Sequence, residues 1–392
     1  MMNRHSGRLA WSILVALVLV GQAFPLLAAE TFGYASRKPQ LWETERPALE
    51  QEPGTNLYWH DPHLGTWETC RLWPPATNGC PPSWYGKVEM LALFRDTSEL
   101  DFATLGPGGP VVLDTGGLDA DFGAGVRALI GKTLGDWYRL EVGYFGSHSW
   151  DGDAAVRNQD ANDQGGTGNL YSPFSSFGAS AGVVGLDYNN FASLRFSSTL
   201  NNGEVNLRRR VLMRPGSYEA SFLVGGRYLN IGEEFEYLTQ SSVPGPGTTT
   251  NQVALETDNS MIGVQVGLLS QFLVQPKCWV DFEMKGGIFA NQVSLDRTYT
   301  VATDQGGTVV YAGEDERDRT SFVGDLSLQV NYQFAPSWTF FAGYNAIWVT
   351  GIALGAENFS NDTGMLTLGP TQVDHSGDAV YHGPNIGLVF TH

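Results

Sequence analysis

Charged residues are scarce in this chain of 392 residues. Asp, Glu, Lys and Arg make up 16 % of it, against roughly 25 % in ordinary soluble domains. Basic residues are especially few, with 23 Lys and Arg against 41 Asp and Glu, which gives a net charge of −18. Because nucleic acid is bound through basic surfaces that release counterions, this balance argues against nucleic acid as a partner.

Cysteine is also scarce, with three residues and no CxxC pair. No spacing fits a zinc site, so the sequence predicts no metal centre built on cysteine and no cofactor. Cys70 and Cys80 bracket the turn-rich segment "RLWPPATNG". We expect this pair to form a disulfide in an oxidising compartment, and Cys278 to remain an inert thiol.

Long apolar runs are missing except near the start of the chain. There, Arg4 and Arg8 precede "LAWSILVALVLVG" and then "QAFPLLAAE". This order is typical of a secretory signal, and the apolar run is short for a spanning helix. We predict a signal peptide over residues 1–29, cleaved after Ala29 or after Ala23, with an uncleaved anchor as the alternative. If the mature chain lies in a membrane, it crosses with strands.

Glycine and aromatic residues are abundant, at 48 glycines and 12 % aromatics. Both suit a protein of many strands. From residue 84 onward, polar and apolar residues alternate with the period of two that is typical of half-buried strands. Residues 30–83 are rich in proline and tryptophan and show no such period, so we predict an irregular periplasmic extension there.

The alternation predicts ten strands, at about 84–95, 120–131, 137–146, 200–213, 217–238, 252–274, 278–300, 309–334, 337–350 and 378–390. Short links, such as "MRPGS" and "FAPS", alternate with long ones along the chain. The long links are expected at about 96–118, 148–199, 239–251, 301–308 and 351–377.

This order of links indicates an all-β fold, an antiparallel up-and-down transmembrane β-barrel over residues 84–392. Its short turns would be periplasmic and its long loops extracellular. A soluble β-sandwich or soluble barrel is the alternative. The strand at 200–213 fits least well because it contains three adjacent arginines, and a count of eight or twelve strands remains open.

The charged residues of these strands fall at alternate positions, so their side chains share one face of the wall, which is predicted to face the lumen. Ten strands enclose only a modest interior, so the charges either fill it as a structural network or line a narrow pore. The predicted lumen-facing residues, five cations and six anions, are Lys87, Glu89, Arg127, Arg139, Glu141, Glu219, Arg227, Asp281, Glu283, Lys285 and Asp325.

Two motifs suggest a ligand and are weak. "GKT" (131–133) lacks the glycine spacing of a phosphate-binding loop. An acidic loop at 148–199 holds oxygen ligands that suit calcium, but Gln164 and Tyr171 occupy positions at which a calcium loop needs acidic residues. A solvated acidic loop is the simpler interpretation of Asp151, Asp153, Asp160 and Asp163.

Acid and histidine pairs at the predicted outer rim suggest a hydrolase as a third function. These pairs are His148 with Asp151, and Asp374 with His375. A general base must lie within hydrogen-bond reach of the group it activates, and no motif around these residues supports such an arrangement. The chain is therefore not predicted to be an enzyme.

Several blocks resemble a planctomycete family, the putative β-barrel porin family that is numbered seventh. The blocks are "VGGRYLNIGEEFEY" (224–237), "TDNSMIGVQVGLL" (257–269) and residues 328–359, with "WYGKVEMLALFRD" at the start and "YHGPNIGLVF" at the end. The resemblance covers roughly 84–392. It implies an outer-membrane β-barrel and assigns no functional residue. The chain departs from many such barrels by ending on Thr391 and His392 and not on an aromatic residue.

These observations predict a cell outer membrane protein, with outer-membrane lipids and the barrel-assembly machinery as its expected partners. The first function hypothesis is a small porin-like barrel for passive passage of small solutes. The alternative is a closed structural or adhesive barrel whose long extracellular loops bind partners. The sequence indicates neither the solute nor the oligomeric state.

Overall fold

The computed structural model describes residues 83–392 apart from 97–98, 119–121, 136, 159–167, 181–185, 215–217, 244–246, 305 and 361–371. The predicted signal peptide, nearly all of the predicted extension and the Cys70–Cys80 pair lie outside the described residues, as do Asp160 and Asp163. Cys278 is a free cysteine. No helix in the described part of the chain is long and apolar enough to cross a membrane.

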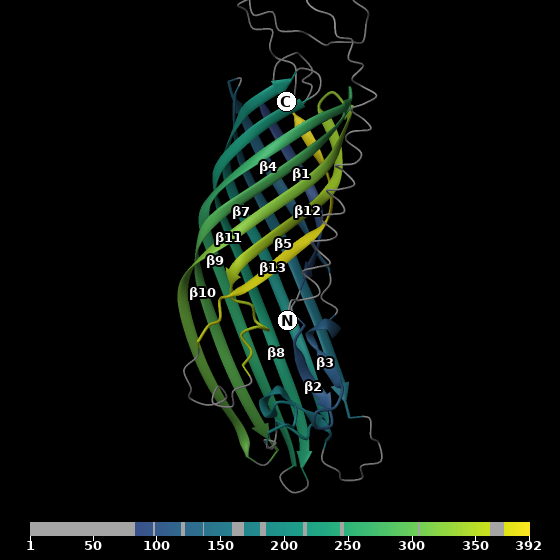
Figure 1. The fold of residues 1–392 in the computed structure, drawn as a ribbon, viewed down its shortest axis with the longest axis vertical. Helices are drawn as coiled ribbons and strands as arrows, with labels where there is room; N and C mark the ends of the chain where they lie inside the picture. The colour runs from purple at the N-terminus through teal and green to yellow at the C-terminus, as the bar shows by residue number, and fades with distance from the viewer. Residues whose placement is uncertain are drawn as a thin grey trace, which may run out of the picture. The chain divides into compact units, whose positions relative to one another are not determined.

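Ten antiparallel strands form a closed barrel (Figure 1). Each strand pairs with the next along the chain, and the ring closes where β1 pairs with both β4 and β13. The prediction of a ten-stranded up-and-down barrel is confirmed. The strands are β1 (Trp84–Asp96), β4 (Phe122–Leu134), β5 (Tyr138–Arg157), β7 (Phe191–Arg214), β8 (Tyr218–Val243), β9 (Gly247–Gln275), β10 (Cys278–Thr303), β11 (Gly307–Ala335), β12 (Trp338–Ile352) and β13 (Gly377–Thr391).

At one end of the barrel the links are as short as predicted, for example between Gln275 and Cys278. At the other end, the predicted long loops at 239–251 and 301–308 are wrong. There β8 runs on to Val243, and β10 and β11 run to within a few residues of each other. Likewise, the expected loop 148–199 begins inside β5 and ends inside β7. The error arises because these strands continue past the region in which their outward residues are apolar.

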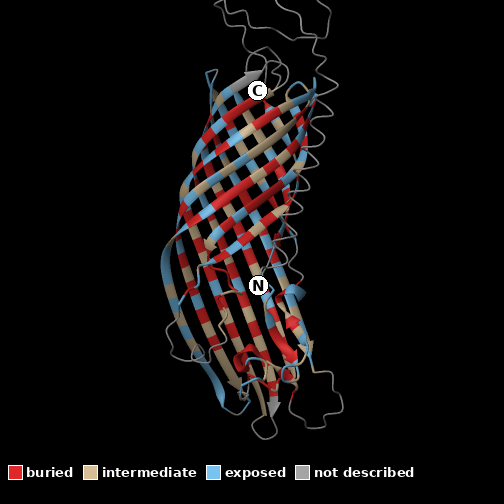
Figure 2. Cartoon of the chain, viewed as in Figure 1, coloured by how far each residue is buried: buried red, intermediate tan, exposed pale blue. Residues whose placement is uncertain are grey.

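Large apolar side chains are exposed on the outward parity of the strands near the short turns. Burial alternates along each strand, as Figure 2 shows. This belt is the surface that lipid would solvate, with aromatic residues near both of its edges. Its members include Val88, Ile130, Val142, Val224, Ile262, Val264, Ile288, Val330 and Ile386, with Trp84, Trp137, Phe334 and Trp338 near the turns and Phe94, Phe122, Tyr144, Tyr228, Phe322 and Trp348 at the far edge.

Beyond the far edge of this belt, the outward face becomes acidic. Glu234, Glu256, Asp296 and Glu314 are direct cross-strand neighbours on β8, β9, β10 and β11. Carboxylates so placed are not solvated by lipid. Strands β8 to β11 are 26–29 residues long, whereas about 9–11 residues cross a bilayer. The outer half of the barrel therefore projects into water.

The barrel wall opens in this outer half. Strand β11 pairs with β12 only from Phe322 toward the turns, and the pairing of β4 with β5 stops at Val126–Gly146. The remaining strands, β5 and β7 to β11, continue outward as a curved sheet. The lower end of the barrel in Figure 1 is this outer end, opposite the C-terminus.

A small cap packs against the inner side of the curved sheet. It consists of β2 (Asp101–Leu105), β3 (Val111–Asp114) and β6 (Leu170–Tyr171), the short helices η1 (Thr115–Gly117) and η2 (Pro173–Ser175), and the segment 352–360. Apolar residues of the cap and the sheet form one buried core. Among them are Leu93, Phe102, Trp150, Leu194, Leu229, Ile231, Phe235, Leu255, Val293, Leu295, Val349 and Leu354.

The belt predicts how outward substitutions act. Val264, 68 % exposed on β9, is expected to lie in lipid. Replacing it with Arg should lower the free energy of unfolding by about 2–4 kcal/mol in a bilayer. The matched change Gln252→Arg, on the same strand and the same face but in the outer half, should change it by less than about 1 kcal/mol. Urea unfolding in lipid vesicles measures both, and equal effects would contradict the position of the belt.

Candidate functional site: the barrel interior

Charged residues from distant strands meet inside the turn-side half of the barrel. Arg208 of β7 donates to Glu141 of β5 from Nε at 2.9 Å and from Nη2 at 3.1 Å. The same Nη2 donates to Glu283 of β10 at 2.7 Å. Strands β7 and β10 are separated by β8 and β9 in the ring, so this bond crosses the interior. Tyr85 adds a hydrogen bond to Glu141 at 2.5 Å.

A second group lies around Lys285 of β10. Its Nζ lies 3.2 Å from Glu204 of β7 and 3.7 Å from Asp325 of β11. Asp325 also lies 3.5 Å from Arg227 of β8, and Gln265 donates to Glu204 at 2.7 Å. Five strands are thus linked through side chains across the lumen.

A third group surrounds Glu89 of β1, which is almost fully buried. Arg127 of the neighbouring β4 contacts it at 2.7 Å, and Lys87 contacts it at 3.4 Å. Asn385 of β13 donates at 2.7 Å to Oε2, the oxygen that Lys87 contacts. Lys87 also donates to Gln329 of β11 at 3.0 Å, again across the interior because β13 and β12 lie between these strands.

The other predicted residues lie closer to the turns. Glu219 of β8 accepts from Arg139 at 3.1 Å and from Arg210 at 3.0 Å. Asp281 of β10 accepts from Gln271 and Asn331, each at 3.0 Å. The structure therefore places each of the eleven predicted residues in contact with a partner on the inner parity of the strands.

Within the part of the chain that the structure describes, the charges of this turn-side network balance. The predicted set has five cations and six anions; Arg208, Arg210 and Glu204 join it, which gives seven cations and seven anions. Sequence reasoning missed these three residues. The signal was present, because Glu204, Asn206, Arg208 and Arg210 share one parity of β7. Arg209, on the other parity, is exposed.

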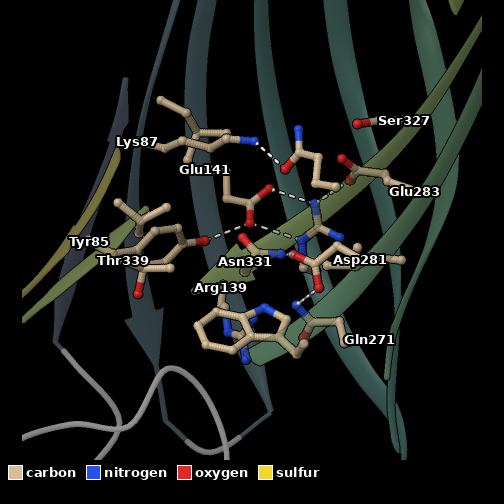
Figure 3. A pocket seen from close by; sticks show the side chains of 16 residues that line it. Tyr85, Lys87, Arg139, Glu141, Gln271, Asp281, Glu283, Ser327, Asn331 and Thr339 are labelled. Carbon is tan, nitrogen blue, oxygen red and sulfur yellow. Dashed lines mark hydrogen bonds and ion pairs between the residues drawn. The ribbon is translucent and has the colours of Figure 1, made fainter. Parts of the chain in front are cut away.

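A cavity of about 110 Å³ remains within this network near the turns. Its wall includes the Arg208–Glu141–Glu283 group and Asp281. The side chains of Glu141, Asp281 and Glu283 point into the same space in Figure 3. The cavity is polar and large enough for several water molecules, at about 10–15 Å³ each. The side chains that line it are Tyr85, Lys87, Leu129, Arg139, Glu141, Arg208, Leu269, Gln271, Trp279, Asp281, Glu283, Ser327, Gln329, Asn331, Thr339 and Val389.

In the outer half, apolar side chains of the cap and the curved sheet pack together inside the wall. The ring of Phe102 in the cap lies 5.1 Å from Phe235, 5.3 Å from Tyr237 and 4.9 Å from Phe359. Tyr237 Oη donates to the Phe102 carbonyl at 2.9 Å. Aromatic contacts at these distances are attractive, so the cap and the sheet are held together by both packing and hydrogen bonding.

A few polar residues within this apolar core bind the cap to the strands through hydrogen bonds and an ion pair. Asn259 of β9 donates to the Ala353 carbonyl at 2.8 Å and accepts from the Ala353 amide at 2.9 Å. Glu233 of β8 accepts from the Gly355 amide at 2.9 Å and pairs with Arg95 of β1. Burial raises the pKa of Glu233, and Arg95 opposes this rise. These contacts also went unpredicted, because the partners are distant in sequence.

The predicted hydrolase residues do not come together as acid–base pairs. His148 is buried inside the barrel, whereas Asp151 is exposed on the opposite face of β5. Hydrogen bonds from Ser376 lower the pKa of Asp374, while His375 contacts Arg319 at 2.5 Å. Within the described residues, no group of three or more acidic, histidine or cysteine side chains is arranged to hold a metal ion.

A closed, belted barrel of this kind defines an outer-membrane β-barrel protein. Residues 95–391 match the family described as "Putative beta barrel porin-7 (BBP7)". The chain belongs to this family, which confirms the resemblance seen in the sequence.

Solved structures with similar folds are distant in sequence. The outer membrane protease OmpT from Escherichia coli is 11 % identical, with a TM-score of 0.40, and the match covers 80 % of this chain and 97 % of OmpT. The Pseudomonas putida toluene transporter TodX is 10 % identical, with a TM-score of 0.34 and coverages of 80 % and 91 %. A FadL homologue from Pseudomonas aeruginosa is 10 % identical, with a TM-score of 0.29 and the same coverages. No curated protein matches the chain.

The ion-pair network predicts a specific pattern of stabilities. Arg208→Met leaves Glu141 and Glu283 without their shared cation, and it should lower the free energy of unfolding by about 3–5 kcal/mol. Adding Glu141→Gln and Glu283→Gln to this variant should recover most of the loss because the unpaired charges are removed. The matched change Arg209→Met, on the outward face, should have an effect below about 1 kcal/mol. Urea unfolding of the refolded proteins measures all three, and a triple variant no more stable than Arg208→Met would contradict the network.

Proposed function

We propose that the chain is a closed outer-membrane barrel that anchors and displays its outer sheet and cap at the cell surface. The observation that carries this proposal is the buried apolar core between the cap and the curved sheet. A hydrated solute that enters from outside would have to displace this core. The acidic outward face of β8 to β11 is the surface such a protein would present to partners.

The turn-side half supports the same proposal. Its seven cations and seven anions are held in contacts that cross the lumen, so a passing ion would have to break them. Breaking a buried pair leaves an uncompensated charge, which is strongly unfavourable. A ten-stranded barrel is also narrow, closer to the filled eight-stranded barrels than to porins of 16–18 strands.

Passive passage of small solutes is the second candidate function. It is favoured by the polar cavity near the turns and by the description of the family as a porin. Passage would require the cap to leave the curved sheet, because Phe102 of the cap packs against Phe235 and Tyr237 of β8 inside the wall. No enzymatic reaction is proposed.

Conductance separates the two candidates. The refolded chain in a planar bilayer should give no current steps. The double variant Phe102→Ala/Phe359→Ala, which removes two rings from the core, should give steps that scale with salt concentration. The matched variant Leu105→Ala, at an exposed position of the same cap, should stay silent. Steps from the unaltered chain at the frequency of the double variant would favour passive passage and contradict the closed barrel.

We further propose that residues 1–29 are a signal peptide and that the barrel-assembly machinery inserts the mature chain into the outer membrane. An apolar run of this length after two arginines favours export followed by cleavage. Sequencing the N-terminus of the protein from an outer-membrane fraction should find Glu30 or Phe24 first. Finding Met1 or Met2 there would contradict the cleaved signal.

A further inference from the structure

The cavity near the short turns has features of a ligand site, which go beyond the closed barrel of the proposed function. We infer that it binds a small neutral polyol that enters from the periplasmic end. Tyr85, Trp279, Thr339 and Val389, which line it, all lie at the turn-side ends of their strands. Because the outer half is packed, this end is the one through which a ligand would reach the cavity.

The charges of the wall favour a neutral ligand. Lys87, Arg139 and Arg208 are matched by equal numbers of carboxylates, Glu141, Asp281 and Glu283. Arg139 pairs with Glu219 outside the cavity, and the other groups contact one another or neighbouring amides. An added ion would find no excess of opposite charge, and in a confined cavity it would lose its hydration without compensation.

The wall also has polar atoms that lack partners. Arg208 Nη1, Gln271 Oε1 and Ser327 Oγ are buried and make no hydrogen bond within the described residues. The three side chains are 5 %, 4 % and 6 % exposed. Buried polar groups are nearly always satisfied, so these atoms need a molecule that both donates and accepts. Hydroxyl groups do both.

Aromatic and apolar side chains complete the wall. Tyr85 and Trp279 lie beside Leu129, Leu269 and Val389. The wall thus combines many polar groups with a few rings and aliphatic side chains. A polyol matches this mixture because its carbon atoms pack on rings while its hydroxyls reach Arg, Gln and Ser. The volume of about 110 Å³, room for several water molecules, suits a small ligand such as glycerol or a single sugar ring.

Saturation-transfer NMR on the refolded full chain in detergent micelles tests this inference, with glycerol, glucose and maltose as probes. We expect saturation transfer to glycerol or glucose, saturable in the millimolar range, and none to maltose, which is too large. Ser327→Leu fills the cavity without removing a charge and should weaken binding at least tenfold. The matched change Ser294→Leu, on the outward face of the outer half, should leave binding unchanged.

The outcomes also separate this inference from the closed barrel. Transfer that is absent, equal in Ser327→Leu, or equally strong to maltose would overturn the polyol site and leave a cavity that holds only water. None of these results bears on conductance. If Ser327→Leu does not fold, as judged by heat-dependent gel mobility, the near-isosteric Gln271→Met removes one unpartnered acceptor and should weaken the same signals several-fold.

Discussion

The whole structure depends on one constraint: neighbouring side chains of a strand point to opposite sides of the wall. Where lipid is on the outside, every outward residue must be apolar, because lipid cannot form hydrogen bonds. The polar and charged residues of those strands then point inward, except near the turns, where Arg209 is exposed on the outward face. Inside a narrow barrel they must find partners, and Arg208, Lys285 and Glu89 find theirs on strands across the lumen or beside them. The ion-pair network is therefore a consequence of the lipid belt.

In the outer half the polarity of the two faces of the wall is reversed. There the outward face meets water and carries Glu234, Glu256 and Asp296, while the inward face carries Phe235, Leu255 and Leu295. The strands run straight through the change, so the barrel is polar inside and apolar outside at the turn end, and the opposite at the outer end. In the outer half the wall is open, and the cap covers the apolar inward face of the curved sheet, which water would otherwise reach. The proposed closure of the lumen follows from that cover.

The fold and most of the charged residues on the inner side of the strands could be predicted from the sequence alone. The alternation from Asp325 to Gln333 predicted which side chains face the lumen, and the short turns predicted the number of strands. The outer ends of β5 and β7 were not predictable from the same signal, because Ser149, Asp151 and Asp153 make the outward face polar there and the apolar alternation stops. The ion-pair partners were also out of reach: Arg208 and Glu283 are 75 positions apart, and only the closed ring brings them together. The cap contact of Asn259 with Ala353 spans 94 positions.

Thiol labelling of single cysteines is the most direct test of the change from an apolar outward face at the turn end to an apolar inward face at the outer end. A chain with Cys70, Cys80 and Cys278 replaced by Ser is reconstituted in vesicles and treated with a membrane-impermeant maleimide from one side at a time. Pro336→Cys, exposed in the short turn between β11 and β12, should react only from the turn side. Leu255→Cys should react from neither side, and its exposed neighbour Glu256→Cys rapidly from the outer side. Labelling of position 255 from the outer side as fast as position 256 would show an open lumen and contradict the account.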